Sequence, residues 1–127
     1  MDEDRIPRLA RRYFDAFQNA DRATMEAGLA EDFTFTSPYD DHISRAAYFE
    51  RCWPHAGSFR FCDEMKIFAQ GDECFVLYQT DGKRGGTFRN TELFRFRGDQ
   101  LVSVEVFFGF VPGAAESAKA AEAARDA

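Results

Sequence analysis

The sequence has little cysteine, and the few cysteines it has do not form a metal site. Of 127 residues only three are cysteine, at Cys52, Cys62 and Cys74. This number is odd and the spacing matches no zinc-binding motif. We interpret the three as reduced core residues, with a disulfide as the alternative. No cofactor motif is present, so we expect neither a metal nor a cofactor.

The sequence also lacks an excess of positive charge and any long apolar run. Its net charge is −6, whereas a nucleic-acid footprint needs a basic patch. No apolar stretch approaches membrane-spanning length, and the first residues, MDEDRIPR, lack the apolar core of a signal peptide. We therefore expect a cytoplasmic protein that binds neither nucleic acid nor membranes.

Phenylalanine, in contrast, is abundant. The chain has 15 phenylalanines, and 45% of its residues are hydrophobic. A chain of this length suits one domain with a substantial core. So many phenylalanines either fill a thick core or line an apolar cavity.

The first half of the chain predicts three helices. Apolar residues between Ile6 and Phe17 repeat with helical spacing. Asp21 is a candidate N-cap for a second helix that ends near Leu29, and Ser44 for a third that ends near Trp53.

The remaining segments predict strands. One is expected at Phe33–Ser37, others near Phe59–Phe68 and Glu73–Thr80, and a final pair between Thr91 and Phe110. Turn residues separate them, and 39–42 is expected to be a polar loop. The order predicts an α+β fold in which the helices cover one face of a curved antiparallel sheet. The alanine-rich tail, 113–127, is expected to be a frayed helix or disordered.

The stretch Thr91–Phe110 is the most informative. Alternation places Glu92 on the same face as Phe94 and Phe96. Burying a carboxylate without a partner is costly, so this pattern points to a pocket. In the second strand alternation separates an inner row from an outer one: Val102, Val104, Val106 and Phe108 against Leu101, Ser103, Glu105 and Phe107.

Two segments carry a resemblance to a known family: ARRYFDAFQNADRATMEAGLAEDFTFTSP and TELFRFRGDQLVSVEVFFG. Together they resemble the nuclear transport factor 2-like superfamily, in its SnoaL-like and ketosteroid-isomerase-like branch, over roughly Leu9 to Phe110. The resemblance implies a cone-shaped domain, here 1–112, in which a bent sheet and helices enclose an apolar cavity. It also implies a homodimer that pairs through the outer sheet face, where Phe107 would otherwise be exposed.

Ketosteroid isomerases use a tyrosine and a protonated aspartic acid as an oxyanion hole, with an aspartate as base. The resemblance places the tyrosine at Tyr13, the oxyanion acid at Glu92 and the base at Ser37. Serine cannot move a proton as a carboxylate does, so this sequence departs from the pattern. Asp40 or Asp41, just beyond Ser37, is a candidate replacement base; alternatively both belong to a turn that precedes the third helix.

Several other side chains are candidates for contact with a ligand. With Ser37, most are aromatic, and the set is Phe17, Phe35, Tyr39, Tyr48, Trp53, Phe94 and Phe108.

Two functional hypotheses follow. In the first, the protein is an enzyme of acid–base chemistry, an isomerase, cyclase or dehydratase, acting on a small apolar carbonyl compound. In the second, it is a non-catalytic module that binds an apolar ligand or serves as a dimeric structural or regulatory unit. The presence of Glu92 favours the first, and the missing base at Ser37 favours the second.

Overall fold

The computed structural model describes residues 4–61, 65–82 and 87–108. Three helices come from the first half of the chain: α1 (Arg5–Gln18), α2 (Arg22–Gly28) and α3 (Arg45–Arg51), and a 3₁₀ turn at Trp53–His55 follows α3. Both predicted N-caps are confirmed. The Asp21 side chain accepts from the backbone N–H of Thr24, and that of Ser44 from the backbone N–H of Ala47, each at 3.2 Å.

Within these described ranges, seven strands form one curved sheet. They are β1 (Leu29–Ser37), β2 (Asp40–Ser44), β3 (Phe59–Phe61), β4 (Lys66–Gln70), β5 (Glu73–Gly82), β6 (Thr87–Arg97) and β7 (Gln100–Phe108). The strand order is β2-β1-β7-β6-β5-β3, and β4 also pairs with β5. The β1–β7 pair is parallel, so the sheet is mixed, whereas the sequence predicted an antiparallel sheet.

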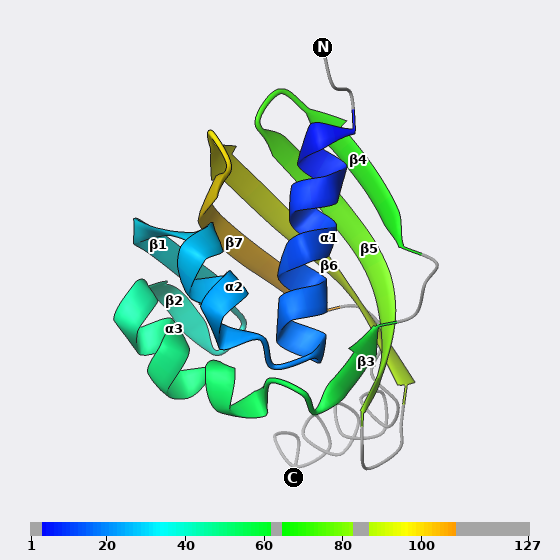
Figure 1. Cartoon of the computed structure of the whole chain (residues 1–127). Coiled ribbons are helices and arrows are strands. Elements are labelled where there is room, and N and C mark those ends of the chain that lie inside the picture. The colour runs from blue at the N-terminus through cyan, green and yellow to red at the C-terminus, as the bar shows by residue number, and fades with distance from the viewer. Residues whose placement is uncertain (1–3, 62–64, 83–86, 109–127) are drawn as a thin grey trace, which may run out of the picture.

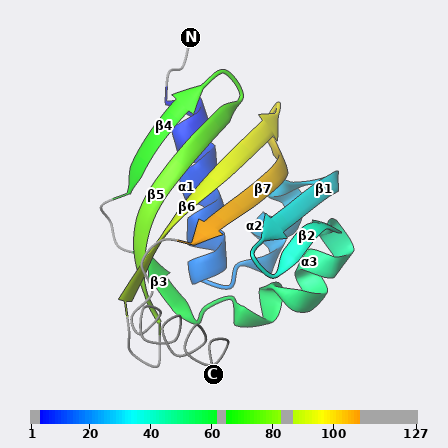
Figure 2. The same cartoon turned by 180° about the vertical axis from the view of Figure 1, so that it is seen from behind.

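The helices all cover the same face of this sheet, which confirms the predicted α+β architecture. In Figure 1, α1 runs across the concave face of β5, β6 and β7, and α2 and α3 lie beside β1 and β2. Figure 2 shows the opposite, uncovered face. The core between helices and sheet includes Phe14, Phe33, Phe94 and Val104, each almost fully buried. Arg5 ties the start of α1 to the β6–β7 turn through Asp99, with 3.0 Å between Nη2 and Oδ1.

The segment predicted as a polar loop, 39–42, contains part of a strand. Strand β2 begins at Asp40 and pairs with β1, so that Phe35 lies opposite Ile43. The strand is short and mostly exposed, and its side chains are largely polar. It therefore has no apolar alternation to reveal it, and its backbone pairing with β1 is what defines it. The single strand expected at Phe59–Phe68 is in fact two, because β3 and β4 pair with different parts of β5.

A β-bulge in β7 corrects the predicted inner and outer rows. Arg95 pairs with Ser103, but the next residue, Phe96, pairs with Leu101, which leaves Val102 as the extra residue. A bulge of one residue reverses which side of the sheet the following positions face. Leu101, predicted to lie on the outer row, is therefore buried with only 3% exposure. The β6–β7 turn itself is as predicted, and Gly98 adopts the positive φ (62°) that this tight turn needs.

Some predictions fall outside the described residues: those for Cys62 and for the tail 113–127. Within the described ranges, none of the helices has both the length and the apolar character to cross a membrane.

Candidate functional site

A cavity of about 230 Å³ lies between the helices and the inner face of the sheet. Its wall is mostly aromatic, and it combines side chains from α1, α3 and five strands. The lining residues are Tyr13, Phe14, Phe17, Phe35, Tyr48, Cys52, Phe59, Phe61, Tyr78, Thr80, Phe88, Asn90, Glu92, Val106 and Phe108. This wall brings together Tyr13 and Glu92 with four of the predicted contact residues, Phe17, Phe35, Tyr48 and Phe108.

Glu92 is buried in this wall and has a partner on the neighbouring strand. Only 5% of the residue is exposed. The hydroxyl of Tyr78 donates a short hydrogen bond to its Oε2, and Nδ2 of Asn90 donates to the same hydroxyl at 3.2 Å. Tyr78 lies directly opposite Asn90 in the β5–β6 pairing, and Glu92 is two residues further along the same face of β6. The strand register therefore builds a linear network, Asn90–Tyr78–Glu92.

Burial raises the pKa of Glu92 from 4.5 to about 7, although the hydrogen bond from Tyr78 acts in the opposite direction. Removing a carboxylate from water disfavours its charged form, and a donor to that form favours it. A carboxyl group whose pKa lies near neutrality has both forms populated there. It can therefore both accept and return a proton, as general acid–base catalysis requires.

Two tyrosine hydroxyls form a second polar group in the wall. The hydroxyl oxygens of Tyr13, from α1, and Tyr48, from α3, are 3.1 Å apart. Burial is the largest cause that raises the pKa of each above its ordinary value, so both hydroxyls keep their protons near neutral pH. The pair has two protons and uses one of them in its own hydrogen bond. The other is left for donation to a ligand oxygen.

The two aspartates proposed as replacement bases do not line the cavity. The side chain of Asp40 is only 10% exposed and forms an ion pair with Arg51, with 2.7 Å between Oδ1 and Nη2. The hydroxyl oxygen of Ser37 is 3.5 Å from Oδ2 of Asp40. Asp41 has 91% side-chain exposure and contacts His42. Asp40 does act on one lining residue, Cys52: burial, and to a lesser extent the charge of Asp40, raises the pKa of the Cys52 thiol to about 11.

Three of the predicted aromatic contacts also lie outside the lining. Tyr39 is largely exposed and rests against Phe108, with 5.5 Å between ring centroids. Trp53 packs behind the wall against Phe17, at 5.9 Å. Phe94 is fully buried in the core, edge-on to Tyr13 at 5.0 Å.

Sequence reasoning missed much of the sheet side of the wall: Phe59, Phe61, Tyr78, Thr80, Phe88 and Asn90. A signal for some of them was present. Within Glu73–Gly82, alternate residues are buried, and Tyr78 and Thr80 continue the row that begins at Cys74. Asn90 has the same parity as Glu92 and therefore faces the same side of the sheet.

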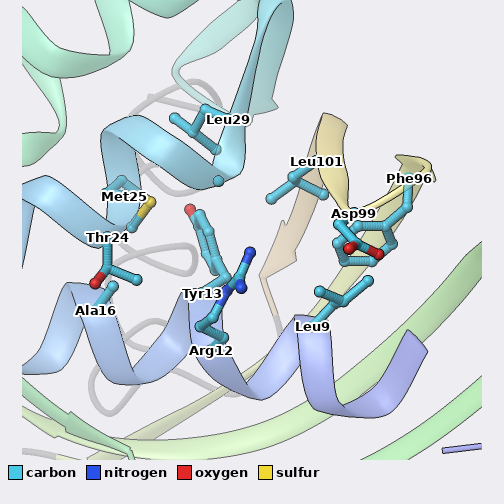
Figure 3. A pocket seen from close by; sticks show the side chains of 11 residues that line it. Leu9, Arg12, Tyr13, Ala16, Thr24, Met25, Leu29, Phe96, Asp99 and Leu101 are labelled. Carbon is cyan, nitrogen blue, oxygen red and sulfur yellow. The ribbon is translucent and has the colours of Figure 1, made fainter. Parts of the chain in front are cut away.

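A second hollow lies on the other side of Tyr13, between α1, α2 and the β6–β7 turn. Figure 3 shows its lining, in which Arg12 and Met25 flank the Tyr13 ring and Leu101 faces it. Its volume is about 20 Å³, which suffices for roughly one water molecule. The larger aromatic cavity is therefore the candidate ligand site. Among the residues that the structure describes, no group of three or more His, Cys, Asp or Glu side chains is placed to hold a metal ion.

Comparison with known proteins identifies the family and the fold. The SnoaL-like domain family matches residues 10–104, which confirms the resemblance seen in the two sequence segments. No curated protein matches the chain.

Several solved structures share the fold. A proposed polyketide cyclase from Xanthomonas campestris pv. campestris is 21% identical, with a TM-score of 0.72 over 84% of this chain and 91% of that one. A proposed ketosteroid isomerase from Kribbella flavida is 18% identical, with a TM-score of 0.72 over 85% and 80%. An NTF2-like protein of unknown function from Mesorhizobium loti is 21% identical, with a TM-score of 0.69 over 87% and 97%.

The raised pKa of Glu92 predicts a pH-dependent stability that Glu92→Gln removes. Because the folded state holds this proton more tightly than the unfolded state, the contribution of Glu92 is fully present below pH 4.5 and is lost as the pH rises through about 7. Between pH 4.5 and 8 the free energy of unfolding of the wild type should fall, relative to Glu92→Gln, by about 3 kcal/mol.

Urea unfolding at a series of pH values measures this difference. Glu31→Gln, which removes an exposed carboxylate, controls for the loss of one negative charge. Parallel pH profiles for the wild type and Glu92→Gln would contradict the assignment.

Proposed function

Because the chain belongs to the SnoaL-like domain family, we propose that its aromatic cavity binds a small apolar carbonyl compound and performs acid–base chemistry on it. The proposed reaction classes are isomerisation, cyclisation and dehydration. The observation that carries the proposal is Glu92, a carboxyl group with a pKa of about 7 in the same cavity wall as the Tyr13–Tyr48 hydroxyl pair.

In the proposed mechanism Glu92 moves the proton and the Tyr13–Tyr48 pair stabilises the negative charge that develops. Ionised Glu92 takes a proton from a carbon next to the carbonyl, and the electron pair of that C–H bond moves towards the carbonyl oxygen. The free proton of the Tyr13–Tyr48 pair is donated to that oxygen as negative charge develops on it. Preorganised donors of this kind are worth about 10²–10³ in rate. Neutral Glu92 then returns its proton at another position.

This mechanism assigns the proton transfer to Glu92 and not to Asp40 or Asp41. Neither aspartate lines the cavity, and Asp40 is already paired with Arg51. The serine at position 37 then needs no substitute, because one carboxyl group with a pKa near neutrality can act as both base and acid. The names of two similar structures, a proposed polyketide cyclase and a proposed ketosteroid isomerase, support the reaction class.

Binding of 2-naphthol, a fluorescent phenol that mimics an enol, tests the cavity. We expect saturable binding to the wild type. Tyr13→Phe removes a hydroxyl group, and Glu92→Gln replaces a carboxyl group that can ionise by an amide that cannot, so each variant should weaken binding by about 1–3 kcal/mol. Fluorescence titration gives the dissociation constants.

Tyr39→Phe is the matched control, since it removes an exposed hydroxyl outside the lining, and it should bind as the wild type does. If Tyr13→Phe, Glu92→Gln and Tyr39→Phe all bind 2-naphthol as tightly as the wild type does, the cavity does not hold the phenol.

Hydrogen exchange separates the enzyme from the non-catalytic binding module. In D₂O the ketone 2-tetralone should exchange the hydrogens beside its carbonyl at a rate proportional to the protein concentration. This rate should rise with pH and reach a plateau above about pH 7, as Glu92 ionises. Proton NMR measures the exchange rate, and Glu92→Gln should abolish the protein-dependent part of it.

Asp40→Asn and Asp41→Asn should keep the rate. Loss of exchange in either variant would show that the general base lies in the β1–β2 segment. Saturable ketone binding without any exchange would instead favour the binding module.

We further propose that two copies of the chain pair through the uncovered face of the sheet in Figure 2. Exposed apolar side chains gather there: Phe75 lies between Phe68 and Leu93 in the strand pairing, and Leu77 and Phe107 flank Thr91 in the next row. Contiguous exposed apolar surface of this kind is typical of protein–protein interfaces.

Phe75→Asp and Phe107→Asp should convert a dimer to a monomer in sedimentation experiments, because each places a charge within the apolar contact. Ala27→Asp, on the exposed side of α2, is the control and should remain dimeric. A wild-type protein that sediments as a monomer at high concentration would rule out the interface.

A further inference from the structure

Asn90 has an unused hydrogen-bond acceptor in the cavity wall. The residue is only 5% exposed and lines the cavity. Its Nδ2 donates to the Tyr78 hydroxyl, but its Oδ1 is buried and has no hydrogen-bond partner. Leaving a buried acceptor unpaired costs about 1–3 kcal/mol, a cost that a bound donor would remove.

The orientation of the amide follows from the network around it. Tyr78 has a single hydroxyl proton and donates it to Glu92, so it presents only lone pairs to Asn90. The NH₂ end of the amide must therefore face Tyr78. If the amide turned over, two oxygens without a proton between them would meet. Glu92 and Tyr78 together thus hold the Asn90 oxygen as the group that is left without a partner.

The other polar groups in the wall each have a hydrogen-bond partner, and Glu92 has Tyr78. Thr80 already donates through Oγ1 to the backbone carbonyl of Arg60 at 2.9 Å. Tyr13 and Tyr48 are bonded to each other. Among the described residues that line the cavity, Oδ1 of Asn90 is the only buried side-chain polar atom without a hydrogen-bond partner.

We infer that Asn90 determines the class of ligand: an apolar ring compound that carries a hydroxyl group, whose O–H donates to Oδ1 of Asn90. This inference rests on the proposed function and narrows it, since the substrate then has a hydroxyl group in addition to its carbonyl. The cavity volume of about 230 Å³ limits the compound to a small ring system. A site that pairs a buried polar group with a substrate hydroxyl discriminates strongly against analogues without one, because the protein group stays unpaired.

The test compares 2-naphthol with its methyl ether, 2-methoxynaphthalene, which keeps the rings and the oxygen but has no proton to donate. The wild type should bind 2-naphthol at least about tenfold more tightly, which is at the lower end of the cost of an unpaired buried acceptor. Asn90→Leu fills a similar volume without an acceptor. It should reduce that preference to about a tenth of its wild-type value, mainly by weakening 2-naphthol binding.

Comparing the preference between the two proteins cancels the difference in size between the two compounds. Thr91→Val, on the same strand but the opposite face, controls for disturbance of β6 and should keep the wild-type preference. Isothermal titration calorimetry measures the affinities of both compounds for all three proteins, and circular dichroism checks that each variant is folded.

The outcomes separate this inference from the proposed function. If both compounds bind the wild type equally, or if Asn90→Leu keeps the full preference, the role of Asn90 is overturned while the cavity remains a binding site. If neither compound binds the wild type, the proposed function fails and the inference fails with it. The wild-type comparison decides the question even where Asn90→Leu does not fold.

Discussion

The buried carboxyl group of Glu92 is the constraint on which the rest of this site depends. A carboxylate on the inner face of a sheet requires either a donor or a proton. Strand β5 supplies the donor, Tyr78, and Asn90 in turn holds Tyr78. Because these residues lie on two paired strands, the register of β5 and β6 determines the hydrogen-bond network. The polar chemistry of the cavity is therefore a consequence of strand pairing.

The aromatic wall explains why the cavity is open and why the carboxyl group is shielded. Many neighbouring rings meet edge to face, as Tyr13 meets Phe94 and Phe61 meets Tyr78. Rings in this arrangement are rigid and have few rotamers with which to fill the space between them. The cavity is thus surrounded by apolar groups, and the same groups keep water from Glu92 and raise its pKa.

Much of this arrangement could be predicted from the sequence, but not the partners within the site. Alternation alone was enough to place Glu92 beside Phe94 on the buried face, because the period of a strand is local. The partnership of Glu92 with Tyr78 could not be read in this way, since it depends on the pairing of residues fourteen positions apart. The bulge that buries Leu101 and the polar strand β2 that carries Asp40 are likewise set by contacts between strands.

The opposing influences on Glu92 explain how one carboxyl group can replace an acid and a base. Burial alone would keep the group neutral, and a neutral acid can give up a proton but cannot take one from a substrate. The Tyr78 hydrogen bond lowers the pKa from that limit and so keeps the ionised form accessible near neutral pH. Asn90, by donating to Tyr78, favours the direction of that hydrogen bond in which Glu92 is the acceptor. The same contact that keeps Glu92 available as a base therefore leaves the Asn90 oxygen free for a ligand, so that proton transfer and ligand recognition depend on one network.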